Sequence, residues 1–420
     1  LARALAPDFT TCYLAQEVCS NATNGKFDLR EYFIEGNIPV LANLPGVKSL
    51  NIDLSSRFSN YSSFGNTTNS AVKLEYRPIS DVLVRGTYAQ VFRAPQIGDL
   101  YSPSQTNNPS FNDPCTGTTT PVGQNANLDK ACQNVPRDGS FAEPTSQITS
   151  IVSGNPKLKP EKGNVYTYGF VVDPSWQYLQ GTTFSVDYFI YKLKDTIEAP
   201  AADTIARQCL ASGDPTYCSL IQRNPDGTIA QIAAPALNLG NVDSRGVDFS
   251  AGYRLPKTPI GRFNFKLDLT YVDRFDRTPN PSDPSSVLHE AGTYSKQDGN
   301  FSRVRGLSAL SWTNWGFDAT FSTRYISSYT VGSTDPNSNL GSADGSLPGV
   351  ALKANASWYY DMTAGYKLKA TKTHFLIGVD NLSDKKPTIL YQNNVLNSNV
   401  DVNTFDTVGR YYFAKIVQSF

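Results

Sequence analysis

The sequence has 420 residues, and its 37 basic and 37 acidic side chains give a formal net charge of zero at neutral pH. It contains no long basic run, which argues against nucleic acid as a partner, and no window of about 18 uninterrupted apolar residues, which excludes a transmembrane helix. There are 23 Tyr and 22 Phe but a single Met, and only 18% of residues are charged. This composition suits pleated strands with aromatic collars better than packed helices.

The six cysteines fall into three close pairs within segments rich in Pro, Gly, Ser and Asn. Their spacing matches neither a zinc ribbon nor a redox motif, and only two histidines could assist a metal, so we expect no metal and no cofactor. We predict local disulfides in an oxidising compartment, with free buried thiols as the alternative. Each disulfide would stabilise the fold by on the order of 2 to 3 kcal/mol, because it restricts the loop in the unfolded chain. The predicted pairs are Cys12 with Cys19, Cys115 with Cys132, and Cys209 with Cys218.

Strands with one apolar and one polar face are predicted from the start of the chain. After a loop over residues 1–25, we predict strands over 26–40 and 50–60, joined by a connection over 41–49. A third strand precedes a tight turn over 77–80, and a fourth begins at Val82 and ends where Pro95 can donate no ladder hydrogen bond.

Two long segments without periodicity interrupt the next strands. Residues 96–155 and 195–239 are rich in turn-forming residues, and we expect each to be a functional surface loop, because such long loops are unusual in compact domains. The alternation is clearest over 263–271, where five apolar residues alternate with four polar ones. Further strands are predicted near 303–312, 317–325, 358–366, 375–379 and 411–416.

The connections alternate in length along the chain, short after odd strands and mostly long after even strands. Transmembrane barrels have this asymmetry, whereas a soluble sandwich has no reason to keep it. We therefore predict an all-β, antiparallel, up-and-down transmembrane barrel wall of about 13 strands, with membrane lipid on the apolar face and water on the polar face. Because bacterial single-chain barrels have even strand numbers, we expect further strands outside these 420 residues.

Five widely separated segments resemble TonB-dependent outer-membrane transporters of Gram-negative bacteria. They are the Phe92-Arg93-Ala94-Pro95 tetrad, the Asn155-Pro156-Lys157-Leu158-Lys159-Pro160-Glu161 segment, Arg245-Gly246 with its surroundings, Asn381-Leu382-Ser383-Asp384-Lys385-Lys386-Pro387, and the terminal Phe420. The resemblance implies that residues 1–420 are the C-terminal part of a barrel of about 22 strands, with long extracellular loops and short periplasmic turns. The plug, the TonB box and the early strands would lie outside it.

The resemblance also implies active uptake of a scarce nutrient: a siderophore complex, a saccharide, a peptide or cobalamin. TonB would act through the absent N-terminal segment, and the loops would capture the small ligand. Loop candidates for ligand contact are Tyr294, Tyr325 and Tyr329. Candidates facing the lumen, which could equally pair with one another or hydrate the lumen, are Arg85, Asp187, Asp248, Arg254, Lys266, Asp268, Arg324 and Asp361.

We predict that the protein is not an enzyme, since neither His289 nor His374 stands in a recognisable catalytic context. The main alternative to active transport is a passive, porin-like channel, and the next is an outer-membrane enzyme. A porin would conduct ions without TonB, whereas an enzyme would lose turnover when either histidine is replaced.

Overall fold

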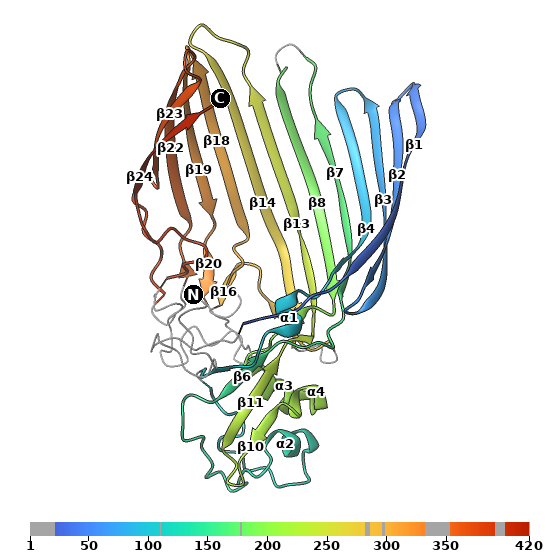
Figure 1. Cartoon of the computed structure of the whole chain (residues 1–420), viewed down its shortest axis with the longest axis vertical. Helices are drawn as coiled ribbons and strands as arrows, with labels where there is room; N and C mark the ends of the chain where they lie inside the picture. Colours follow the sequence, from blue (N-terminus) through green and yellow to red (C-terminus); the bar gives the residue numbers. More distant parts are fainter. Residues whose placement is uncertain are drawn as a thin grey trace.

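One large antiparallel sheet makes up most of the protein (Figure 1). The computed structural model describes residues 22–109, 111–176, 179–281, 286–295, 299–331, 353–390 and 400–419. Thirteen long strands follow one another in chain order across the sheet. They are β1 (Leu29–Leu44), β2 (Val47–Tyr61), β3 (Gly65–Ile79), β4 (Val82–Arg93), β7 (Glu161–Val172), β8 (Thr182–Lys194), β13 (Asn241–Arg254), β14 (Arg262–Thr278), β18 (Val304–Asn314), β19 (Phe317–Ile326), β22 (Ser357–Leu368), β23 (Thr373–Asp380) and β24 (Tyr411–Gln418).

The two faces of the sheet differ as the alternation predicts. In an antiparallel ladder, residues directly opposite each other point to the same side. One row crosses five strands as Val84, Phe170, Val186, Phe249 and Leu269, and the face that carries it is called the outer face. Its large apolar side chains are not packed in a dry interior, since Val84 is 44% exposed and Phe170 is 39% exposed. Such a face suits hydrocarbon, and the opposite, charged face is called the inner face.

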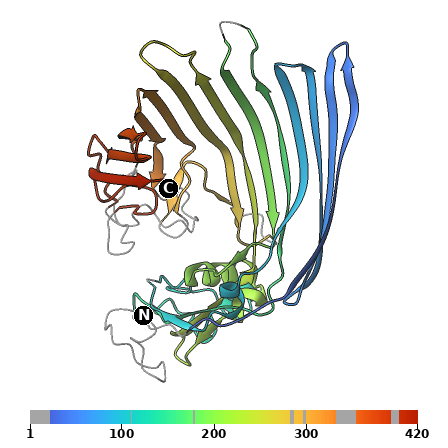
Figure 2. The ribbon, with the colours of Figure 1, turned by 45° about the horizontal axis from the view of Figure 1, so that its top comes forward.

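The sheet is strongly curved but open (Figure 2). Within the described residues β1 pairs only with β2, and β24 pairs only with β23. The predicted all-β, up-and-down architecture and strand number are confirmed, whereas the described strands do not close a barrel. None of the helices in the described ranges is long and apolar enough to cross a membrane.

Short connections lie at one end of the sheet, the turn end, and the long connections lie at the other, the loop end. This confirms the predicted asymmetry, but two turns are tighter than expected. The first hairpin turns at Pro45 and Gly46, with Gly46 at φ +73°, so the predicted connection over 41–49 is mostly strand. Likewise β3 continues to Ile79, and its turn is formed by Ser80 and Asp81. The positive φ in the first of these turns is one that Gly adopts without strain.

The two segments predicted as long loops instead fold together into one unit, which we call the cap (residues 97–158 and 197–239). Strand β6 from the first segment pairs in parallel with β11 from the second, within a four-stranded sheet of order β10, β11, β6, β5. The first segment supplies α1 (Ile97–Tyr101), β5 (Gln105–Asn107), α2 (Ala126–Ala131) and β6 (Ser150–Ser153). The second supplies β9 (Ile197–Glu198), α3 (Ala202–Ser212), α4 (Pro215–Cys218), β10 (Ile221–Arg223), β11 (Ile229–Pro235) and β12 (Leu237–Asn238).

The cap has its own buried core, to which both segments contribute. Ile205 and Ile232 are fully buried there, together with Phe111 and Leu128. The predicted disulfides Cys115–Cys132 and Cys209–Cys218 are both formed and both lie in this core. The Cys12 and Cys19 pair lies outside the described residues.

A smaller sheet at the loop end has the order β17, β16, β20, β21. Its strands are β16 (Thr293–Ser295), β17 (Gly299–Asn300), β20 (Tyr329–Val331) and β21 (Lys353–Ala354), while β15 (Leu288–His289) pairs with the end of β14.

Replacing Leu267 by Arg should test the assignment of the faces. Leu267 is central on β14, opposite Ala251 and Ser308 on the outer face. An Arg at mid-membrane on a lipid-facing side costs about 2 to 4 kcal/mol, so we expect the free energy of unfolding in lipid vesicles to fall by that amount. The control is Thr363→Arg on the inner face of β22, opposite Thr320 and Gly378, which should cost under about 1 kcal/mol. Equal losses in the two variants would contradict the assignment.

Candidate ligand-binding surface

On the inner face, Arg85 and Asp187 form a bidentate ion pair that crosses an intervening strand. Arg85 Nε and Nη2 lie 2.8 and 2.6 Å from the two carboxylate oxygens of Asp187. Gly169 of β7 stands between them in the register, and a Cβ there would lie 2.5 Å from Asp187 Oδ1. Because Gly169 has no side chain, Arg85 can reach across β7 to Asp187. The structure thus brings together these two of the predicted inner-face residues.

The other inner-face carboxylates on β13 and β14 bind neighbouring hydroxyl groups. Asp248 lies opposite Asp187 and accepts a hydrogen bond from Thr270 Oγ1 at 2.7 Å, while Asp268 accepts one from Ser250 Oγ at 2.7 Å. Cross-strand partners therefore hold these acids on the inner face.

Two predicted residues, Arg254 and Lys266, remain as cations without an ion pair to any described residue. Both line an open depression of about 620 Å³ in the half of the inner face nearer the turn end. Ser185, Ser250 and Asp268 also line it. This depression offers charged and hydroxyl groups to a hydrated solute.

Arg324 and Asp361 anchor the segment between β23 and β24 to the inner face. Arg324 pairs with Asp406, and its guanidinium carbon lies 4.6 Å from the ring centroid of Tyr359. Asp361 accepts the backbone N–H of Asn381 at 2.8 Å. Both predicted residues thus have a structural partner in a loop.

The three predicted loop tyrosines occupy packing positions. Tyr294 and Tyr329 are 3% and 2% exposed and belong to a small core at the loop end. Tyr325 lies within β19, on the outer face, with its ring centroid 4.4 Å from that of Trp358. The structure therefore places all three in strands rather than in loops, and ligand contact by them stays a prediction.

Polar contacts that sequence reasoning missed join the cap to the ends of the barrel strands. Arg93, at the end of β4, binds Glu161 of the neighbouring strand β7 through two nitrogens at 2.8 and 2.6 Å, and it also binds Asp99 of the cap helix α1 at 3.1 Å. Glu161 also accepts the backbone N–H of Ile197 at 2.7 Å. Arg93 and Glu161 lie in two of the family-like motifs described above, and membership of those motifs was the only sequence signal that could have indicated their importance.

A cleft of about 320 Å³ lies between the cap and the barrel wall at the loop end. The residues that line it include the small apolar run from Ala199 to Ala202, which leads into α3, Val152 of β6 and Arg277 of β14. Arg277 Nη1 is 3.3 Å from Glu198 and Nη2 is 3.1 Å from Glu290, so the barrel, the cap and the neighbouring loop meet here. A small ligand entering from outside would meet this cleft before the inner face.

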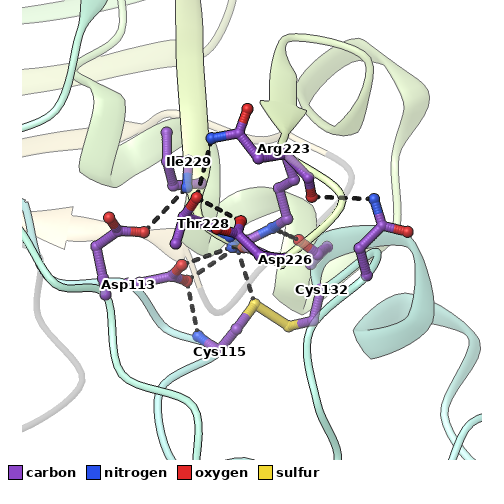
Figure 3. Close-up of polar contacts among 12 residues, drawn as sticks. Asp113, Cys115, Cys132, Arg223, Asp226, Thr228 and Ile229 are labelled. Carbon is purple, nitrogen blue, oxygen red and sulfur yellow. Dashed lines mark hydrogen bonds and ion pairs between the residues drawn. A yellow bond between two sulfur atoms is a disulfide. The ribbon is translucent and has the colours of Figure 1, made fainter.

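Inside the cap, one buried ion pair connects its two segments (Figure 3). Arg223 Nη1 and Nη2 lie 2.6 and 2.9 Å from the carboxylate of Asp113, and both side chains are almost completely buried. Asp113 Oδ1 also accepts the backbone N–H of Cys115, and Arg223 Nε donates to the carbonyl of Ala131. Each charge is therefore compensated by further hydrogen bonds, as burial requires.

Tyr217 ties the cap to the barrel. Its hydroxyl group donates to the carbonyl of Pro279, just beyond β14, at 2.9 Å. The side chain is 1% exposed, and this burial, reinforced by the nearby carboxylates of Asp214 and Glu198, raises the pKa of Tyr217 to about 12.

The described residues contain no group of three His, Cys, Asp or Glu side chains placed to hold a metal ion. Each histidine instead meets one carboxylate, His289 with Asp276 and His374 with Asp318, both at 2.8 Å. Within the described chain neither histidine is hydrogen-bonded to a serine hydroxyl, so the contacts assemble no Ser-His-Asp triad.

The family assignment agrees with this geometry. A family model described as the TonB dependent receptor-like β-barrel matches residues 4–382. The chain belongs to this family. As a TonB-dependent receptor β-barrel chain it resides in the Gram-negative outer membrane, which confirms the predicted location. No curated protein matches the sequence.

Solved structures with the same fold include three receptors or transporters. The siderophore receptor PirA from Acinetobacter baumannii has a TM-score of 0.57 at 16% identity, over 94% of this chain and 46% of that receptor. A mutant ferric enterobactin receptor from Pseudomonas aeruginosa, in complex with enterobactin, has a TM-score of 0.56 at 15% identity, with 94% and 46% covered. The FrpB iron transporter from Neisseria meningitidis has a TM-score of 0.50 at 12% sequence identity, and the match covers 93% of this chain and 44% of that transporter. The TonB-dependent receptor β-barrel chain thus spans a little under half the length of these proteins.

Replacing Arg223 by Met should destabilise the cap by about 3 to 5 kcal/mol, because the carboxylate of Asp113 would stay buried without its partner. Limited proteolysis in urea measures this, with the barrel monitored by its heat-modifiable electrophoretic mobility. The control is Lys157→Met, which removes an exposed cap cation that has no ion pair with any described residue and should cost under about 1 kcal/mol. The double variant Arg223→Met, Asp113→Leu should recover much of the loss. A single variant as resistant as the parent would show that the pair does not hold the cap together.

Tyr217 should make the cap lose stability at alkaline pH. Its folded pKa lies above the ordinary value of 10.0, so the folded state keeps the proton while the unfolded state releases it. The stabilisation is complete below pH 10 and is lost as the pH rises toward 12, by up to about 3 kcal/mol. Subtracting the 295 nm absorbance titration of Tyr217→Phe from that of the parent should isolate one phenol near pH 12 in the folded protein and near pH 10 in denaturant. A difference midpoint near 10 in both states would contradict the burial argument.

Proposed function

We propose that the protein takes part in TonB-dependent uptake of a ferric siderophore across the outer membrane, with this chain supplying barrel wall and the ligand-capturing cap. The family match over residues 4–382 carries the proposal. Two of the structurally similar proteins are named for siderophores, and one of those structures contains enterobactin. These names support iron complexes over saccharides, peptides and cobalamin, the other ligands that the sequence leaves open.

The arrangement of the surfaces supports capture followed by passage. The cleft under the cap stands at the loop end, and the depression around Arg254 and Lys266 lies further along the inner face. Many ferric siderophore complexes are anionic, so two cations without protein partners would favour their entry into the barrel. Cations lining a concave surface raise the local concentration of an anionic solute.

Uptake of radioactive iron by iron-starved cells that lack other siderophore receptors would test the proposal. Cells producing the protein should accumulate iron from at least one ferric siderophore in a panel, and deletion of TonB should abolish the uptake. The double variant Arg254→Gln, Lys266→Gln should lower initial uptake roughly two- to tenfold at low ionic strength. The matched control is Lys369→Gln, Lys372→Gln, which removes two exposed charges at the turn end.

The same cells separate the rival functions. Solute entry that continues without TonB and rises linearly with concentration would indicate a passive channel. TonB-dependent uptake of cobalamin, a saccharide or a peptide, with no siderophore transported, would keep the transport function but exclude the iron ligand. Chemical conversion of a ligand that stops in His374→Gln would indicate an enzyme.

A further inference from the structure

We propose that the outer face carries a binding site for the phosphate groups of an outer-leaflet glycolipid, at the loop end of β7, β8, β13 and β14. The site is a basic patch made up of Lys162, Lys192, Lys194, Arg245 and Arg274. These four strands are neighbours in the sheet (Figure 1), so residues distant in sequence form one continuous surface.

The register places the patch directly beyond the lipid-facing part of the wall. Moving from the membrane centre toward the loop end, the apolar row defined above is followed by a row that contains Tyr168, Tyr188 and Tyr271. Tyr168 is 54% exposed and lies beside Tyr188, with ring centroids 5.2 Å apart. Exposed tyrosines at this depth mark the boundary between hydrocarbon and headgroups in membrane barrels.

The basic residues begin one row above these tyrosines. Arg245 and Arg274 lie directly opposite each other, Lys192 follows in the next row, and Lys162 lies directly opposite Lys194 in the row after that. Successive rows on one face are two residues apart, or about 7 Å along a strand. The patch therefore spans about 7 to 20 Å beyond the tyrosine row, at the depth of lipid headgroups.

Two of the five positive charges in the patch are compensated by carboxylates, and the three lysines are not. Arg245 holds Asp243 at 2.8 and 2.6 Å, while Asp276 binds His289 at 2.8 Å and lies 3.5 Å from Arg274. These two carboxylates are thus already engaged. None of the three lysines has an ion pair or a side-chain hydrogen bond to any described residue, and all three are exposed.

Like charges directly opposite on a sheet repel each other. Arg245 and Arg274 each have a carboxylate beside them, but Lys162 and Lys194 lie directly opposite each other without an ion pair to any described residue. An anion between them would remove this repulsion. We assign it to a lipid rather than a soluble anion, because the patch continues without a break into the tyrosine and apolar rows. Acyl chains would lie over those rows while the phosphate groups meet the cations.

The test compares full-length protein in neutral detergent with its triple variant Lys162→Gln, Lys192→Gln, Lys194→Gln. The probes are bisphosphorylated lipid A, the same glycolipid without its phosphates, and inorganic phosphate, with binding measured by native mass spectrometry at low salt. We expect the bisphosphorylated lipid to bind the parent at least tenfold more tightly than the dephosphorylated lipid. A basic residue near an anionic surface is worth about fivefold in affinity, so the triple variant should lose well over tenfold.

Two further variants separate the patch from net charge and from misfolding. The control Lys257→Gln, Lys369→Gln, Lys372→Gln removes three exposed charges at the turn end and should bind like the parent. The charge-retaining variant Lys162→Arg, Lys192→Arg, Lys194→Arg should also bind, which keeps the test valid if the glutamine variant folds poorly. Equal binding of the two lipids, equal losses in the glutamine and control variants, or displacement of the lipid by inorganic phosphate at equal concentration would each overturn the proposal.

Discussion

Hydrogen bonding of the backbone is the constraint on which the rest of this structure depends. In hydrocarbon an unpaired N–H or C=O group costs several kcal/mol, so a membrane-spanning strand must pair on both sides. Strands β2 to β23 satisfy this condition through antiparallel ladders with their neighbours in chain order, with local register shifts such as the one between Arg245 and Gly246 of β13. Once each ladder is in register, alternate side chains are committed to hydrocarbon or to water, and a slip of one residue would exchange the two.

Register also explains which polar contacts form on the inner face. Arg85 and Asp187 are 102 residues apart in sequence, yet the ladders of β4, β7 and β8 place them on one row with only Gly169 between them. The sequence pattern was sufficient to assign both residues to the polar face, because alternation alone decides that. Their pairing could not be predicted, since it depends on the relative shift of three strands, and no local signal in those strands encodes it.

The cap was beyond sequence reasoning for a related reason. Its two segments lack periodicity because neither contains enough strand or helix to bury a core alone, and the core appears only when β6 lies parallel to β11, about 80 residues later. Cysteine spacing did predict Cys115–Cys132 and Cys209–Cys218, because each pair lies within a single segment. The buried pair of Arg223 with Asp113 joins the two segments, and so it remained hidden. Contacts within one segment could therefore be predicted from the sequence, whereas contacts between the two segments could not.

The attachment of the cap to the wall limits how a ligand can be captured. Arg93 with Asp99, Arg277 with Glu198, and Tyr217 with the carbonyl of Pro279 fasten it to the ends of β4 and β14. Two disulfides and an internal core stiffen it further. A swing of the whole cap would break several of these contacts at once, at a cost of a few kcal/mol even if each is worth only about 1 kcal/mol. A surface that is already ordered loses little conformational entropy on binding. If the cap captures ligand as we propose, it would therefore do so as a preformed cleft rather than as a closing lid.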